Sequence, residues 1–151
     1  EQGHAIRLVG GSSEKELGEQ VAERVDSPDV ENLIGATTIH QLMGLVNGAR
    51  MVIGVDSGIA HISAALGAPT VVLWGPSSFQ KSHPVGPAVF YINKHMPCAP
   101  CYGPAFYGLL GPRAAVEACE SNRSCMADIT VEDVLAQVTL ALESDRRGCG
   151  P

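Results

Sequence analysis

Short apolar runs alternate with segments of helical periodicity along most of this chain, and this alternation restricts the folds open to it. The clearest run, Met51–Val55, contains no charged residue. A strand without charge indicates cover on both faces, as in a parallel sheet. Thr70–Trp74 is a second such run, and a helical segment ending near Leu66 separates the two. Strands joined through helices predict right-handed βαβ units. We therefore expect an α/β fold, a Rossmann-like parallel sheet with helices on both faces.

The remaining elements follow the same pattern. Further strands are predicted at residues 6–9, 31–34 and 88–92. Apolar residues at helical spacing predict the inner faces of three more helices. These residues are Leu17, Val21, Ala22 and Val25 in the first, Ile39, Leu42, Met43, Leu45 and Val46 in the second, and Val131, Val134, Leu135, Val138 and Leu142 in the third. Thr37 or Thr38 can cap the second helix, and Thr130–Asp133 resembles a capping box for the third.

Length and charge narrow the organisation and the partners. The chain of 151 residues fits one domain, which we predict to cover residues 1–145. Residues 146–151 lack an apolar period and are predicted to form a disordered tail. A net charge of −6 argues against nucleic acid as a partner. The apolar runs are well short of the roughly 18 residues that a transmembrane segment needs.

Three turns follow the carboxyl ends of predicted strands, where open α/β sheets bind their ligands. The sharpest contains Asp56, Ser57, Gly58 and His61 at the start of a helix. Free N–H groups at a helix start attract phosphate, and Gly58 has no Cβ to keep an anion away. Ser57 and His61 can donate to a diphosphate, while Asp56 can hold the turn or accept from a sugar hydroxyl. A purely structural alternative stays open, in which Asp56 caps the helix and His61 is a half-buried helix residue.

The other two turns are Gly10–Glu14 and Gly75–Ser78. The first is not a full dinucleotide fingerprint, although Glu14 can accept from ribose hydroxyls. Glu14 can equally serve only to complement the dipole at the helix start. In the second turn Ser77 can donate to a phosphate, and the simpler alternative is a turn that merely ends a strand.

Taken in order, these segments resemble the C-terminal domain of the family 9 glycosyltransferases, the lipopolysaccharide heptosyltransferases. The resemblance covers residues from about 6 to 143, and its most specific part is Asp-Ser-Gly-x-x-His followed by Gly-x-Pro and Gly-Pro. The stretches that carry it are residues 8–11 with Glu14, residues 53–61, 64–69 and 73–77, and a cysteine-rich stretch ending in Cys125-Met126.

The resemblance implies one half of a GT-B enzyme, in which two Rossmann-like domains face each other across a cleft. This half would bind the donor, typically ADP-heptose. The contacts that the resemblance implies are Asp56, Ser57, Gly58 and His61 to the diphosphate and sugar, Glu14 to the ribose and Thr37 in the adenine pocket. Gly11 and Ser77 are predicted as further donor-binding residues.

The same resemblance implies what this chain would not do alone. Family members invert the anomeric centre without a metal, using a carboxylate base in an N-terminal domain outside this chain. We therefore expect no catalytic residue here and no transfer by this chain by itself. The lipid A–core acceptor would bind through that other domain, at the cytoplasmic side of the inner membrane. Apolar surface exposed on the cleft face would also permit a homodimer.

Four cysteines form a separate pattern. Cys98, Cys101, Cys119 and Cys125 have a spacing compatible with a four-thiolate zinc site, although the second pair is spaced more widely than usual. Three interpretations stay open: reduced structural thiols, a zinc or iron–sulfur site, and disulfides formed on isolation. The resemblance implies that no cofactor is required. A structural zinc at these cysteines is the cofactor candidate that the sequence offers.

Two alternative functions stay open. The chain could be the nucleotide-binding half of another GT-B enzyme that uses a UDP-sugar, which donor preference would separate from an ADP-sugar enzyme. It could also be a non-catalytic domain stapled by zinc. In that case removal of the metal would unfold the chain, and nucleotides would have no effect.

Overall fold

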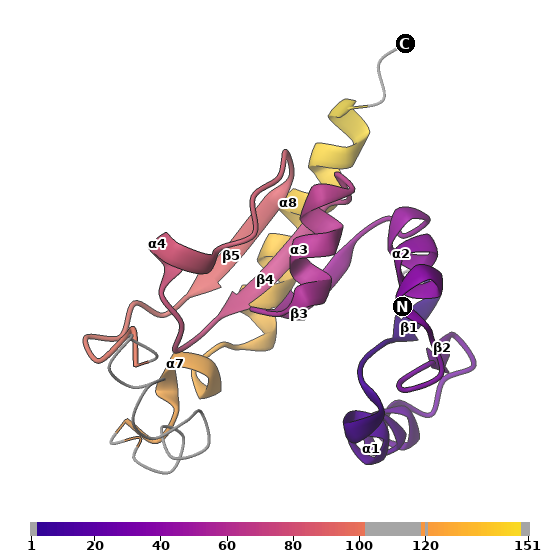
Figure 1. Cartoon of the computed structure of the whole chain (residues 1–151), viewed down its shortest axis with the longest axis horizontal. Helices are drawn as coiled ribbons and strands as arrows, with labels where there is room; N and C mark the ends of the chain where they lie inside the picture. Colours follow the sequence, from indigo (N-terminus) through magenta and orange to yellow (C-terminus); the bar gives the residue numbers. More distant parts are fainter. Residues whose placement is uncertain (1–2, 102–118, 120, 149–151) are drawn as a thin grey trace. The chain divides into compact units, whose positions relative to one another are not determined.

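The computed structural model describes residues 3–101, 119 and 121–148 (Figure 1). The chain divides into two compact units, Glu1–Leu45 and Val46–Pro151. The single domain expected over residues 1–145 stays a prediction. None of the described helices combines the length and the apolar character needed to cross a bilayer.

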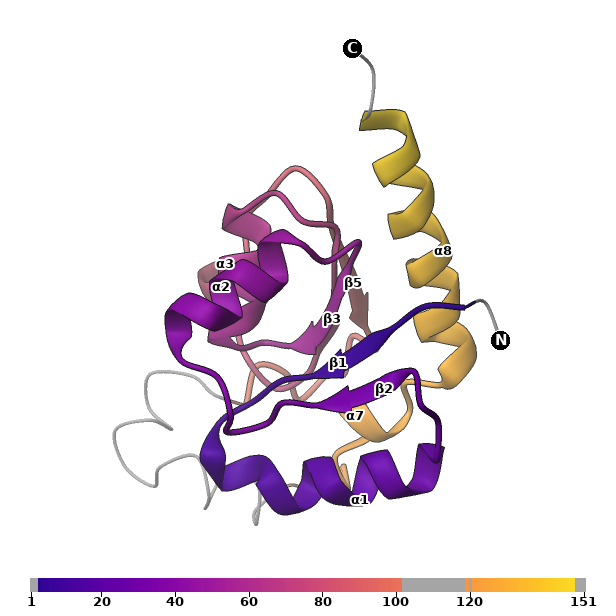
Figure 2. The same cartoon turned by 90° about the vertical axis from the view of Figure 1, so that its right-hand side faces the viewer.

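The first unit contains a pair of parallel strands. Its elements are β1 (Ile6–Leu8), the short 3-10 helix η1 (Ser12–Glu14), α1 (Lys15–Val25), β2 (Val30–Asn32) and the start of α2 (Ile39–Asn47). Figure 2 shows the two strands side by side, with α1 running along them. Gly18 of α1 is buried, and a Cβ there would lie 2.6 Å from Ile34 Cδ1. The glycine therefore lets the helix approach the segment after β2 closely.

Side chains and glycine conformations set the ends of these elements. Thr38, not Thr37, caps α2: the Gln41 N–H donates to Thr38 Oγ1 at 3.3 Å, and the Thr38 N–H donates to Gln41 Oε1 at 2.9 Å. The strand predicted at 31–34 ends earlier, at Asn32. There the Asn32 side chain accepts from the Ile34 N–H at 3.1 Å, and Gly35 adopts a φ of 69°. This turn bends the chain away from strand geometry.

The inner faces predicted for α1 and α2 are less covered than expected. Leu17 of α1 is 60% exposed and Ile39 of α2 is 54% exposed, whereas Val46 is buried. The two strands beside α1 are three residues long each, so they cover only part of the apolar stripe of this helix.

The second unit is a three-stranded parallel sheet in the order β3-β4-β5. Its elements are β3 (Val52–Val55), α3 (Gly58–Ala65), β4 (Thr70–Trp74), α4 (Phe79–Ser82), β5 (Val89–Asn93), α7 (Ser124–Ala127) and α8 (Val131–Gly148). The three strands lie within one residue of their predicted bounds. Gly67, which directly follows the Leu66 C-cap of α3, has a φ of 77°.

Helices cover both faces of this sheet, as predicted. Alternate residues of β4 point to opposite sides. Val72 and Trp74 pack with Ala60 of α3, while Val71 packs with Ala141 of α8. Figure 1 shows α3 and α8 on the two sides of the strands. β4 is the buried centre of the sheet, and the loop with Ser77 begins at its carboxyl end.

Two details of this unit differ from the prediction. Ile53 and Val55 of β3 are about half exposed, because α8 packs on β4 and β5 instead of β3. On α8, Val134, Val138 and Ala141 face the sheet, whereas Val131 and Leu135 are exposed. Ala141 gives only a weak apolar signal in the sequence. The face that periodicity predicts for α8 is therefore rotated about the helix axis relative to the observed one.

The last helix is also longer than predicted. α8 continues through Gly148, so residues 146–148 are helical and not part of a disordered tail, and residues 149–151 lie outside the described chain. Arginine is a strong helix former, so the sequence Arg146-Arg147 favours continuation of the helix. The N-terminal capping box is confirmed, because Thr130 and Asp133 exchange backbone-to-side-chain hydrogen bonds of 2.8 and 3.2 Å.

Candidate functional site

The turn after β3 leaves the start of α3 open. The N-cap is Ser57, in extended conformation, and no side chain caps the first turn in the described part of the chain. The N-cap of α3 is thus Ser57 and not Asp56, so the cap role that the structural alternative gave to Asp56 is wrong. Among the described residues, a Cβ built on Gly58 would meet nothing within 4 Å, so the space beside Gly58 is open there. Backbone N–H groups and the helix dipole are thus presented to a ligand there.

The Asp56 carboxylate lies between two other predicted site residues. Its Oδ2 accepts a hydrogen bond of 2.5 Å from Ser77 Oγ, and its Oδ1 lies 3.8 Å from His61 Nε2. The Asp56 side chain is 23% exposed and the His61 side chain 47% exposed. Asp56 and Ser77 follow neighbouring parallel strands, so the sheet brings them together. The Ser77 hydroxyl donates to Asp56 here, and any contact to a phosphate would have to replace that bond.

The loop that carries Ser77 is held by the buried Trp74. The Trp74 indole N–H donates to the Ser77 carbonyl at 3.0 Å, and Trp74 is 1% exposed. Its ring packs edge-on against Phe79, with centroids 5.3 Å apart. On the other side of the loop, a Cβ at Gly75 would lie 2.6 Å from Met126 Sδ. The tight packing on both sides fixes the position from which Ser77 reaches Asp56.

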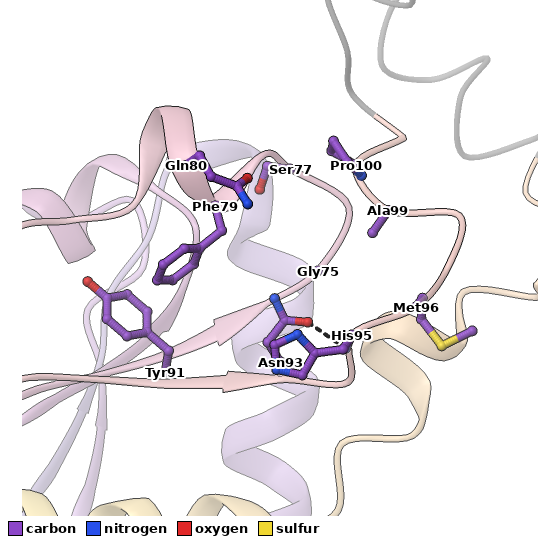
Figure 3. A pocket seen from close by; sticks show the side chains of 10 residues that line it. All are labelled: Gly75, Ser77, Phe79, Gln80, Tyr91, Asn93, His95, Met96, Ala99 and Pro100. Carbon is purple, nitrogen blue, oxygen red and sulfur yellow. Dashed lines mark hydrogen bonds between the residues drawn. The ribbon is translucent and has the colours of Figure 1, made fainter.

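A pocket of about 420 Å³ opens beside this loop (Figure 3). It lies at the carboxyl ends of β4 and β5 and is lined by Gly75, Ser77, Phe79, Gln80, Tyr91, Asn93, His95, Met96, Ala99 and Pro100. Apart from Ser77, sequence reasoning selected none of these as ligand contacts. Asn93 ends β5 and directly follows the strand predicted at 88–92, so the same strand-end argument could have found it.

The Gly10–Glu14 turn of the first unit is closed by the Glu14 side chain. The Gly11 N–H donates to Glu14 Oε2 at 2.7 Å, and the Glu14 N–H donates to the Gly11 carbonyl at 3.0 Å. A Cβ at Gly10 would lie 2.6 Å from Glu14 Oε2, so a glycine is needed to admit the carboxylate. Thr37 is half-buried beside the cap of α2. The contacts expected of Gly11, Glu14 and Thr37 with a nucleotide stay predictions.

The four cysteines are free thiols in one neighbourhood of the second unit. Cys98 Sγ and Cys119 Sγ lie 3.8 and 3.5 Å from Ser121 Oγ. Hydrogen bonds from Ser121 and from the Arg123 N–H lower the pKa of Cys119. Burial raises the pKa of Cys101 and Cys125, and nearby thiols add to this effect. Among the described residues, no group of three or more potential ligands is arranged to hold a metal. The zinc site stays a prediction.

Known proteins are similar to this chain in sequence and in fold. The model of glycosyltransferase family 9 (heptosyltransferase) matches residues 1–105. The chain is 32% identical to lipooligosaccharide heptosyltransferase 2 of Haemophilus influenzae over 87 residues, covering 56% of this chain and 25% of that protein. It is 30% identical to lipopolysaccharide heptosyltransferase 1 of Pseudomonas aeruginosa over 102 residues, covering 67% of this chain and 28% of that protein. The chain thus matches only about a quarter of the length of these relatives.

Two solved structures have the same fold. The E. coli ADP-heptose lps heptosyltransferase II superposes with a TM-score of 0.73 at 22% identity, over 96% of this chain and 38% of that one. A family 9 glycosyl transferase from Veillonella parvula superposes with a TM-score of 0.72 at 20% identity, over 91% of this chain and 36% of that one. The family match covers well over half of the present chain. The chain therefore belongs to glycosyltransferase family 9, the heptosyltransferase family.

Proposed function

We propose that this chain is the donor-binding domain of an inverting heptosyltransferase that uses ADP-heptose and acts on the lipopolysaccharide inner core. The observation that carries the proposal is the uncapped start of α3, with Asp56 held beside it by Ser77. Family membership and the heptosyltransferase activity named for the relatives support it.

In this proposal the diphosphate of the donor binds at the start of α3. The N–H groups of Gly58 and Ile59 and the helix dipole attract its negative charge. His61 is half exposed at the same end of the helix and donates a further hydrogen bond. Asp56 accepts from a hydroxyl group of the donor, since its Oδ1 has only the distant His61 as a partner among the described residues. These groups would stabilise the charge that develops on the departing ADP.

The chain by itself is proposed to bind the donor without transferring heptose. Attack by an acceptor hydroxyl needs a general base, and in this proposal a domain outside this chain supplies that base. The same domain would bind the lipid A–core acceptor. The complete protein would then work at the cytoplasmic face of the inner membrane, where a lipid-linked acceptor is accessible.

Calorimetric titration with ADP and UDP tests the proposal. We expect ADP to bind at least about tenfold more tightly than UDP, a difference of about 1.4 kcal/mol. His61→Ala is expected to weaken ADP binding by roughly tenfold or more, because a hydrogen bond to a charged group is lost. His4→Ala, an exposed histidine outside the second unit, serves as the matched control. Equal or tighter binding of UDP, or an unchanged affinity in His61→Ala, would contradict the proposal.

A further inference from the structure

One residue, Ser77, links the pocket at the ends of β4 and β5 to the Asp56 turn. Ser77 lines the pocket and also donates its hydroxyl to Asp56. A ligand group that leaves the start of α3 past Asp56 would therefore enter this pocket next. Its volume of about 420 Å³ is enough for a monosaccharide.

The polar lining of the pocket is mostly neutral. None of the lining residues is a lysine, an arginine or a carboxylate, and His95 is the one titratable group besides the Tyr91 phenol. Figure 3 shows the side-chain amides of Asn93 and Gln80 pointing toward the cavity. Neutral amides suit hydroxyl groups, which both donate and accept, better than they suit a phosphate.

The orientation of the Asn93 amide is set by its neighbour. Asn93 Oδ1 accepts a hydrogen bond of 2.7 Å from the His95 N–H. The amide oxygen is thereby held at the loop, and the NH₂ group is left for the cavity, where the described residues give it no partner. Asn93 is thus positioned as a hydrogen-bond donor toward a ligand.

Aromatic rings form another part of the lining, beside Gln80 and Asn93 (Figure 3). Phe79 packs edge-on against Tyr91, with centroids 4.9 Å apart, and stacks on His83 at 4.7 Å. The Tyr91 hydroxyl donates to the Pro84 carbonyl, so its polar end is occupied. Aromatic rings present an apolar body whose face is electron-rich and attracts polarised C–H groups. An apolar surface beside amide donors matches a sugar ring, which has C–H faces and hydroxyl edges.

We propose that this pocket binds the glycosyl group of the sugar nucleotide, and that Asn93 selects that group by donating to one of its hydroxyls. This inference rests on the proposed function, because it needs the diphosphate to bind at α3. The donor would then extend past Asp56 and Ser77, and its sugar would lie over the ends of β4 and β5. Gln80, exposed on α4, contributes a second and weaker contact.

Comparison of ADP with ADP-heptose on the 151-residue chain separates the two subsites. Asn93→Asp keeps an oxygen that accepts from the His95 backbone N–H. It replaces the NH₂ donor by a carboxylate oxygen, which can only accept. We expect it to lower ADP-heptose affinity by about tenfold and to leave ADP affinity within about twofold. Gln80→Ala is expected to give a selective loss of about threefold. Asn122→Asp, an exposed asparagine outside the pocket, is the matched control and is expected to change neither affinity.

The outcomes distinguish the inference from the function on which it rests. If Asn93→Asp and Gln80→Ala weaken ADP as much as ADP-heptose, the pocket holds the nucleotide and the inference is overturned. If both variants bind both ligands like the parent chain, the donor does not reach the pocket. If the parent chain binds neither ligand, the proposed function falls and the inference falls with it. Should Asn93→Asp not fold, as judged by its thermal transition, Gln80→Ala alone decides between these results.

Discussion

The two units each contain a glycine-bearing turn between a strand and a helix, yet only one of them is open. In the first unit, the Glu14 carboxylate accepts from the Gly11 N–H at 2.7 Å and so occupies the turn. In the second unit, the Asp56 carboxylate is drawn to Ser77 on the neighbouring strand end, and no side chain caps α3 among the described residues. An acidic side chain can thus close an anion site or leave it open, depending on which donor holds it.

Removing the support of the open turn is expected to have the largest effect. Trp74→Ala should lower the free energy of unfolding by about 3–5 kcal/mol, because a fully buried aromatic side chain leaves a cavity. It also removes the N–H that holds the Ser77 carbonyl. Chemical denaturation measures the loss. Leu135→Ala on the exposed side of α8 should cost less than about 1 kcal/mol, and a similar cost for both would mean that Trp74 does not organise this loop.

Opening the closed turn should have a smaller effect. Glu14→Ala is expected to lower the free energy of unfolding by about 1 kcal/mol, because Gly11 loses its acceptor. Titration with ADP and with 2′-deoxy-ADP adds a test of the ribose contact predicted from the sequence. If Glu14 binds the ribose, the parent chain distinguishes the two nucleotides and Glu14→Ala does not. Equal discrimination by both proteins would leave Glu14 with a structural role alone.

The smallest effect on stability is expected from the ion pair between Lys94 and Asp133 in the second unit, at acid pH. Lys94 Nζ donates to Asp133 Oδ2 at 2.7 Å, and this bond, with the Thr130 N–H, lowers the pKa of Asp133. A lowered pKa in the folded state stabilises the protein above the ordinary aspartate pKa, and this stabilisation is lost as the pH falls through the folded value. The free energy of unfolding should therefore decline on acidification below about pH 4.

Substitution of the lysine isolates this contribution. Lys94→Met should flatten the acid part of the stability curve, measured by denaturation at a series of pH values. Lys81→Met, at an exposed position of α4, should leave the curve unchanged. An identical acid limb in the parent chain and in Lys94→Met would show that the Lys94–Asp133 pair carries none of the pH dependence.

The sequence predicted those features that depend on local pattern. The uncharged run at Met51–Val55 and the glycine turn after it were sufficient to place a strand, a turn and a helix, and the capping box at Thr130 needs only four residues. The fold class follows from the same alternation of strands and helices.

What the sequence missed depends on contacts between distant residues. The hydrogen bond from Ser77 to Asp56 spans 21 positions and exists because β3 and β4 are neighbours in the sheet. The exposure of Leu135 and the burial of Ala141 follow from how α8 lies on β4 and β5. Periodicity identifies an apolar stripe but does not say which edge of it a sheet covers. The pocket likewise needs residues from β5 and from α4, which no single motif contains.

The proposed function depends on binding of the donor diphosphate at the open start of α3. The most direct measurement is the change of backbone amide ¹H–¹⁵N chemical shifts as ADP is added to the chain. We predict the largest shifts at Gly58 and Ile59, and a loss of these shifts in His61→Ala at the same ADP concentration. Saturable binding of ADP that leaves the chemical shifts of the Gly58 and Ile59 amides unchanged would contradict a diphosphate site at the start of α3.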